Sequence, residues 1–396
     1  LHRQHAQHGS WRSPHGDLVS HAEEGAGAFV VAFVAASSLA GDRAGRGPLS
    51  HARRCRAQSC RRASRKSTSQ VAAATARAAC GDPGQPPEPP FELREEDWRR
   101  RVLEYRREVR ALFGGLEPAG VRAHPILNFF RVYYGFDPYT DGAAVRWSPG
   151  LGVRLLGASA GDFGQQLPSR AWRAVSPAVE LHVAGHPLTK PSRLAALFHT
   201  QGILRELRER PPLFSCFGLH EWAMLYRPTL DGQQRLHQSL PLRVSQEEID
   251  RVVEEAPLRC THFDAVRFYT PAAEPLNVHR EAFRSLGRKS EAVLEQPGCL
   301  HVTMDLFRWA RELWPFLPSD LLLKALRSGL RARALDMRAA PYDLSGVCPL
   351  HGHQVLGDLR PVRVETAQGR AEYATLQEEV WREARVVAEE LSHHLE

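Results

Sequence analysis

The chain has 396 residues, 43% of them hydrophobic, and a formal net charge of +7. This length allows one large domain or two medium ones, and four cysteines in a body of more than 300 residues exclude a secreted disulfide scaffold. The charge lies in residues 1–80, which hold 12 of the 52 basic and four of the 45 acidic residues. Residues 81–396 are therefore nearly neutral, which disfavours DNA as a partner without excluding it.

Residues 1–80 have the composition of a targeting presequence. Residues 41–80 are basic and rich in Ser and Ala, as transit peptides are. The apolar segment 26–40 is shorter than the roughly 20 residues that span a bilayer, but it fits the hydrophobic region of a signal peptide. Together they predict import into a plastid, with the mitochondrion as the alternative and a misannotated 5′ extension as a third reading. We expect residues 1–80 to be disordered.

The next segments predict a linker and the start of a folded body. Residues 81–92 are rich in Pro and form a linker. The pattern of residues 93–113 predicts a helix, because apolar side chains recur every three or four positions. Residues 125–135 fit either a helix or a strand, and residues 147–157 predict a turn followed by a strand.

The remaining segments favour helices. Helices are predicted over residues 190–208, 245–255, 300–313, 318–337 and 371–391, and a strand is predicted over residues 262–269. Ser245 with Glu248 fits a capping box at the start of one of these helices. The fold class is therefore mainly α with a minor β component (α+β), in a single domain over residues 93–396. No transmembrane anchor is predicted in this body.

A Cys, a His and an acidic residue follow one another closely in three separate segments. These are Cys216-Phe-Gly-Leu-His220-Glu221, Cys260-Thr-His262-Phe-Asp264 and Cys299-Leu-His301-Val-Thr-Met-Asp305. Thiols, imidazoles and carboxylates ligate metals, transfer protons and attack electrophiles. The pattern predicts one site that folding assembles from three segments.

Each His–acid pair has a functional and a structural interpretation. On a helix, His301 and Asp305 share a face, so Asp305 either orients the imidazole or makes a local hydrogen bond. On a strand, His262 and Asp264 point to one side, which indicates either a site or a polar seam. Glu221 lies in an apolar run, where it is either tuned for proton transfer or paired with Arg267 or Arg338.

The metal-binding interpretation depends on the histidines. The cysteine and histidine spacings do not match those of zinc fingers or ribbons. His220, His262 and His301 could still hold a divalent metal together with an acid, although nothing in the sequence requires a cofactor. The cysteines are more typical of buried packing residues.

Several motifs, read together, resemble one family. The segments CFGLHEWAMLYR, RCTHFDAVRFYTPAAEPLN, QPGCLHVTMDLFRWA, LDMRAAPYDL and VRVETAQGRAEY resemble bacterial and plastid proteins commonly labelled 3-methyladenine DNA glycosylase, over about His124 to Tyr373. This resemblance implies a hydrolase that cleaves the N-glycosidic bond of a damaged base, with a small-molecule or base-like substrate.

The expected site residues follow from the motifs and the reaction. A carboxylate would activate water while a histidine moves the proton. The candidate catalytic residues are Glu221, His262, Asp264, His301 and Asp305, and the candidate substrate-binding residues are His220, Trp222, Arg267, Asn277, Arg338, Tyr342 and Asp343. The alternative is a non-catalytic organellar factor that binds a cofactor or a metal in the same pocket.

Overall fold

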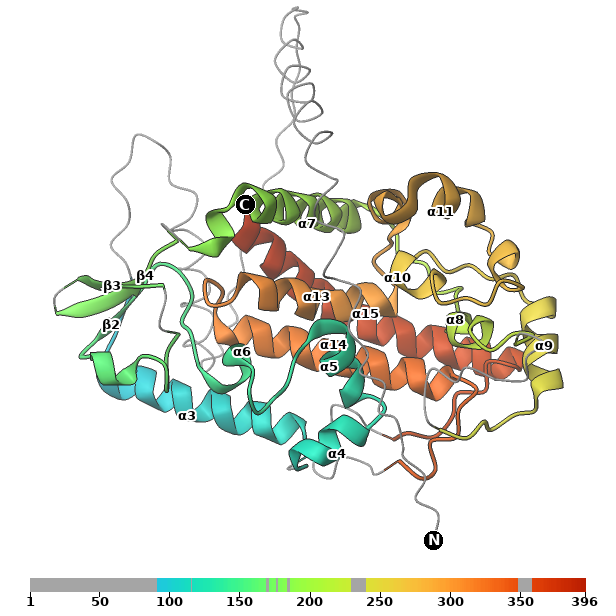
Figure 1. Cartoon of the computed structure of the whole chain (residues 1–396), viewed down its shortest axis with the longest axis horizontal. Coiled ribbons are helices and arrows are strands. Elements are labelled where there is room, and N and C mark those ends of the chain that lie inside the picture. Colours follow the sequence, from blue (N-terminus) through green and yellow to red (C-terminus); the bar gives the residue numbers. More distant parts are fainter. Residues whose placement is uncertain are drawn as a thin grey trace, which may run out of the picture. The chain divides into compact units, whose positions relative to one another are not determined.

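The computed structural model describes residues 91–396, except residues 115, 169–170, 176, 184–185, 229–239 and 348–357. These residues belong to one compact unit and are mainly helical with one small sheet (Figure 1). The predicted fold class is therefore confirmed. The predicted presequence, residues 1–80, lies outside the described residues, as does most of the linker over residues 81–92.

The described helices and strands follow in chain order. The strands are β1 (Phe91–Leu93), β2 (Val153–Leu156), β3 (Trp172–Val175) and β4 (Ala178–Leu181). The helices are α3 (Glu95–Leu112), α4 (Pro118–Ala123), α5 (Leu127–Tyr134), α6 (Gly142–Val145), α7 (Pro191–Glu209), α8 (Leu219–Ala223), α9 (Gln246–Glu255), α10 (Phe263–Val266), α11 (Arg280–Leu286), α12 (Glu291–Leu294), α13 (Leu300–Leu313), α14 (Ser319–Ala339) and α15 (Ala367–Leu395). None of the described helices is long and apolar enough to cross a bilayer.

The four strands form one sheet in the order β1-β2-β4-β3. β1 runs parallel to β2, and the two other pairs are antiparallel. Helix α3 packs on this sheet, where the indole of Trp98 donates a hydrogen bond to the carbonyl of Leu156 at 3.0 Å. The sheet lies at one end of α3 (Figure 1).

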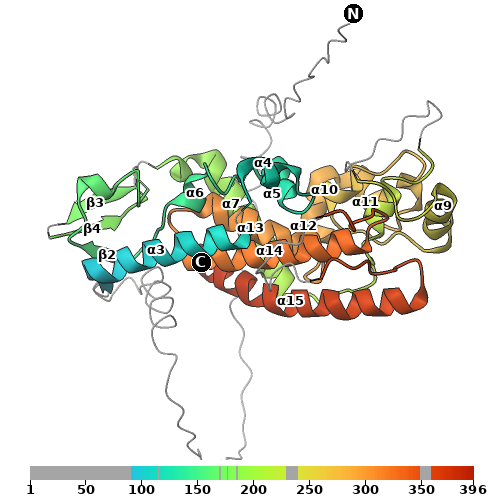
Figure 2. The same ribbon diagram turned by 90° about the horizontal axis from the view of Figure 1, so that it is seen from below.

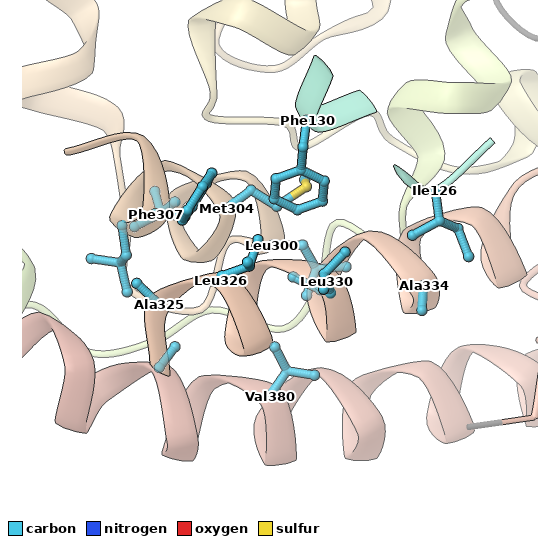
Figure 3. Packing of buried hydrophobic residues seen from close by; sticks show 14 of the residues in the cluster. Ile126, Phe130, Leu300, Met304, Phe307, Ala325, Leu326, Leu330, Ala334 and Val380 are labelled. Carbon is cyan, nitrogen blue, oxygen red and sulfur yellow. The ribbon is translucent and has the colours of Figure 1, made fainter. Parts of the chain in front are cut away.

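Helices α13, α14 and α15 pack against one another and form the centre of the body. Figure 2 shows α15 running along α14, on the side away from α4 and α5. Their contact buries Leu330 of α14 and Met304 of α13 completely, with Phe130 of α5 packed over them (Figure 3). Complete burial of a leucine side chain is worth about 1.5–3 kcal/mol, so this contact fixes how the three helices lie.

Most long helices lie where the sequence predicts them. The hydroxyl of Ser245 caps α9 by accepting a hydrogen bond from the amide of Glu248. Residues 125–135, which fitted helix or strand, contain helix α5, and Gly135 ends it in the left-handed conformation. The last helix is longer than predicted at both ends, and Thr366 caps its start.

The predicted strand over residues 262–269 is wrong. His262 is extended, but residues Phe263–Val266 form the short helix α10, and the amides of Ala265 and Val266 bond to the carbonyl of His262. The alternation of side chains over a strand therefore does not apply here. His262 points into the body, whereas Asp264 is partly exposed.

Candidate functional site

Helix α8 carries His220 and Glu221 into the centre of the body. The helix follows Phe217 and Gly218, which have φ of 51° and 67°. A Cβ atom on Gly218 would lie 3.2 Å from the Cβ of Ala339 at the end of α14, so this position needs glycine both for its conformation and for the close approach. The turn presses α8 against α14, and both His220 and Glu221 are buried.

Three histidines come together between these elements. The His301 ring lies 4.5 Å from the His220 ring, edge to face, and 4.7 Å from the His262 ring, nearly parallel. His301 comes from the first turn of α13, and His262 precedes α10. Burial, reinforced by the two neighbouring histidines, lowers the pKa of His301 well below its ordinary value. His301 is therefore neutral and can offer a nitrogen lone pair.

Asp336 of α14 faces the first of these histidines. Its Oδ1 lies 2.8 Å from Nε2 of His220, and both side chains are buried. Burial alone would raise the pKa of Asp336, but His220 and Arg333 hold it below its ordinary value. Asp336 therefore stays an anion in the interior.

Arg333 lies between two carboxylates. Its Nη1 donates to Oε1 of Glu221 at 2.7 Å and also contacts Asp336. Glu221 is therefore ion-paired, but its partner is Arg333 and neither of the two expected arginines, Arg267 and Arg338. Arg333 lies three residues before Asp336 on α14. One guanidinium and two carboxylates leave one formal negative charge in this group, apart from any charge on His220.

His262 faces Glu295 in the segment before α13. Nδ1 of His262 lies 2.7 Å from Oε1 of Glu295, and both side chains are about 95% buried. Burial lowers the pKa of His262, but the carboxylate of Glu295 outweighs it and raises the pKa to about 9. Burial also raises the pKa of Glu295 itself. With His262 protonated, His262 and Glu295 form a buried ion pair.

Several polar atoms of these His–carboxylate pairs are buried. Nε2 of His220, Oδ1 of Asp336, Nδ1 of His262 and both carboxylate oxygens of Glu295 are buried and lack an aligned hydrogen bond. Such atoms are rare in folded proteins, because each costs roughly 1–3 kcal/mol. In both pairs an imidazole nitrogen faces a carboxylate oxygen at 2.7–2.8 Å, and a cation placed between them could bind both groups.

A small cavity adjoins the histidines. It leaves about 10 Å³ for the centre of a water-sized sphere, which is about enough for one water molecule. Its wall includes the thiols of Cys216, Cys260 and Cys299 and the side chains of His220, His301 and Tyr373. All three cysteines of the sequence pattern therefore border one space, and burial raises the pKa of each thiol.

Two candidate catalytic acids lie away from this cavity. Asp264 accepts hydrogen bonds from both Nη atoms of Arg288, at 2.8 and 3.1 Å, and pairs with Arg267 at 2.9 Å. Asp305 accepts from the hydroxyl of Tyr134 at 3.0 Å and from Arg308 at 2.6 and 3.0 Å. Of the two interpretations of Asp305, the structure agrees with a local contact, since its partner on the same helix is Arg308 and not His301.

The other expected substrate-binding residues have structural contacts. The indole of Trp222 donates to the carbonyl of Ala339 at 2.9 Å, and Tyr342 is buried. Asn277 holds the loop at Cys260 through a 3.1 Å bond to its carbonyl. Arg338 donates to the carbonyl of Arg360, and Asp343 closes a local turn with the amide of Ser345. The structure does not bring these five side chains to the cavity.

Sequence reasoning did not select three residues that complete the site: Glu295, Arg333 and Asp336. Glu295 lies four residues before Cys299, just outside the third motif. Arg333 and Asp336 are three apart on an otherwise apolar helix face, and this spacing was the available signal. No protein-family model, curated protein or solved structure matches this chain.

Proposed function

We propose that the protein binds a divalent first-row transition metal through His220, His301 and Asp336. The observation that carries the proposal is the meeting of these three buried side chains, whose potential ligand atoms all lie within 4.8 Å of one another. They come from α8, α13 and α14, so folding brings them together in the interior.

The ligand atoms fit such an ion in distance. Atoms bound to one tetrahedral Zn²⁺ lie about 3.3 Å apart, given metal–ligand bonds of about 2.0–2.2 Å. Nε2 of His220 and Oδ1 of Asp336 are already 2.8 Å apart and have no aligned hydrogen bond to lose. Separating these two atoms by about half an ångström would give the spacing of zinc ligands, and the ligand atom of His301 lies within 4.8 Å of both.

The ligand chemistry also supports a transition metal. Two imidazoles and one carboxylate suit Zn²⁺ and Fe²⁺, whereas Ca²⁺ and Mg²⁺ prefer oxygen ligands throughout. The negative charge left by Glu221, Arg333 and Asp336 would be compensated by a cation at this position. Arg333 would then orient the ligand Asp336 from behind, as supporting residues do at metal sites.

Metal analysis of the purified full chain tests this proposal. We expect a stoichiometric transition metal, and we expect His301→Ala or Asp336→Asn to lower its affinity by more than about 100-fold, because a ligand matters more than a supporting residue. His199→Ala is the matched control, since the His199 side chain is half exposed on α7. Equal metal content in all four proteins, or none in the wild type, would refute the site.

A second candidate function, hydrolysis, is favoured by the cavity. Catalytic zinc sites combine three protein ligands with one water, and the space beside His220 and His301 is the size of one water. A bound metal would supply acidification of that water. Glu221 accepts from Arg333 through Oε1, and the same guanidinium contacts Asp336, so Glu221 would help to hold the ligand Asp336 in place.

The resemblance to glycosylases gives this candidate a specific substrate, a damaged base. A cavity for one water does not hold a base, so the reaction requires α8 or the segment before α13 to move. We expect metal-loaded protein to release methylated base from alkylated DNA, and chelated protein and Asp336→Asn to release none. Absence of release by the loaded wild type would leave metal binding as the function.

A further inference from the structure

We propose that His262, Glu295 and Cys299 form a second metal position beside the first. This inference extends the proposed function, since it makes the same buried site a two-metal centre. The three potential ligand atoms lie within 4.8 Å of one another, and all three residues are buried. No residue is shared between the two positions.

The surroundings of Glu295 are the main evidence for a metal at this position. Both of its carboxylate oxygens are buried and lack an aligned hydrogen bond, although Nδ1 of His262 lies 2.7 Å from one of them. A buried carboxylate normally has each oxygen satisfied by donors. A metal ion bound by Glu295 and His262 would give a partner to Oε2 of Glu295, which has no donor, and would replace the contact between Oε1 and Nδ1 of His262.

The segment that carries these ligands is held rigidly. Arg210 donates to the carbonyl of Glu295 at 2.6 Å, and Gln377 donates to the carbonyl of Gly298 at 2.6 Å. The side chain of Gln296 accepts from the amide of Leu213 at 2.9 Å. These bonds tie residues 295–299 to α7, to α15 and to the segment before α8. A preorganised backbone of this kind is what a metal site needs from its surroundings.

The two positions meet at the histidine rings. The His262 ring stacks on the His301 ring at 4.7 Å, so a ligand of one position packs directly on a ligand of the other. Cys299 is the N-cap residue of α13, two residues before His301. The start of α13 therefore carries one ligand of each position, Cys299 and His301.

The thiol defines the metal class of the second position. One imidazole, one carboxylate and one thiolate suit Zn²⁺ or Co²⁺ and disfavour Mg²⁺ or Ca²⁺. Cys299 binds only as a thiolate, so its proton leaves as the metal–sulfur bond forms. Cobalt therefore provides a direct probe, because a cobalt–thiolate bond absorbs in the near ultraviolet.

Titration of the metal-free full chain with Co²⁺ tests the second position. We expect two equivalents in the wild type with thiolate absorption, one equivalent without that absorption in Glu295→Gln and Cys299→Ser, and one equivalent with the absorption in Asp336→Asn. Cys260→Ser is the matched control, since Cys260 borders the same cavity but lies outside both ligand sets; it should keep both equivalents and the absorption.

The outcomes separate the two proposals. One equivalent in the wild type that Asp336→Asn removes and Glu295→Gln keeps would overturn the second position and retain the first. One equivalent that behaves in the opposite way would retain only the second. If Glu295→Gln does not fold, Cys299→Ser tests the second position instead, because this variant keeps Glu295 and His262 in place. Persistence of the thiolate absorption in Cys299→Ser would overturn the second position.

Discussion

Replacing Arg333 by methionine should destabilise the protein by roughly 3–5 kcal/mol, the cost of breaking a buried ion pair from one side. Arg333 is about 97% buried and holds both Glu221 and Asp336. Methionine has a similar length but no charge, so the two buried carboxylates of Glu221 and Asp336 would lose the cation that they share. Denaturant unfolding of chelated protein measures the loss, since a bound metal would compensate part of it.

Two further variants control this measurement. Arg331→Met, on the same helix, removes an exposed pair with Glu383 and should change the free energy of unfolding by less than about 1 kcal/mol. Adding Glu221→Gln to Arg333→Met removes one of the unpaired charges and should recover more than about 1 kcal/mol. If Arg333→Met and Arg331→Met lowered the free energy of unfolding equally, the ion pairs of Arg333 with Glu221 and Asp336 would not stabilise the fold.

The stability of the metal-free protein should fall by on the order of 3 kcal/mol between about pH 6.5 and about pH 9. The Glu295 carboxylate raises the pKa of His262 from 6.5 to about 9. A raised pKa means that the folded state holds the proton more tightly. Its contribution is complete below the unfolded pKa and is lost as the pH rises through the folded pKa. Glu295, whose own pKa is raised by burial, acts in the same direction at lower pH.

His262→Gln isolates this effect in unfolding experiments across that pH range. The variant should be less stable than the wild type at pH 6.5, and the difference should shrink toward pH 9. Buried thiols add a common alkaline slope in both proteins, because burial raises the pKa of Cys260 and Cys299. Parallel pH curves for the two proteins would mean that His262 is neutral in the folded state.

The fold could be predicted where the sequence carries a long period. In helices α13, α14 and α15 apolar side chains recur every three or four residues, and these side chains pack in the core as the pattern predicts. The strand prediction for residues 262–269 failed because so short a segment fits both the helical period and the strand period. Only tertiary contacts, such as the bond between Asn277 and the carbonyl of Cys260, decide its backbone.

The candidate site was predictable in part for a similar reason. Local motifs placed His220, His262 and His301 near thiols, and the structure brings their rings together. The carboxylates that face them come from elsewhere in the chain. Asp264 and Asp305 are close to histidines in the sequence, but in the structure they pair with arginines. Glu295 and Asp336 are distant from their histidines in the sequence, and folding brings them into contact. Sequence spacing identifies partners within an element better than partners between elements.

The origin of the site in separate elements has a consequence for folding. Glu221 and Arg333 are 112 residues apart, and the ligand sets draw on α8, α13, α14 and the segments around His262 and Glu295. An unfolded chain would lose much entropy in closing such loops, so it cannot hold these side chains in place by itself. Metal should therefore bind only to the native state and stabilise it against unfolding. Each tenfold increase in metal concentration above the dissociation constant should add about 1.4 kcal/mol to the free energy of unfolding.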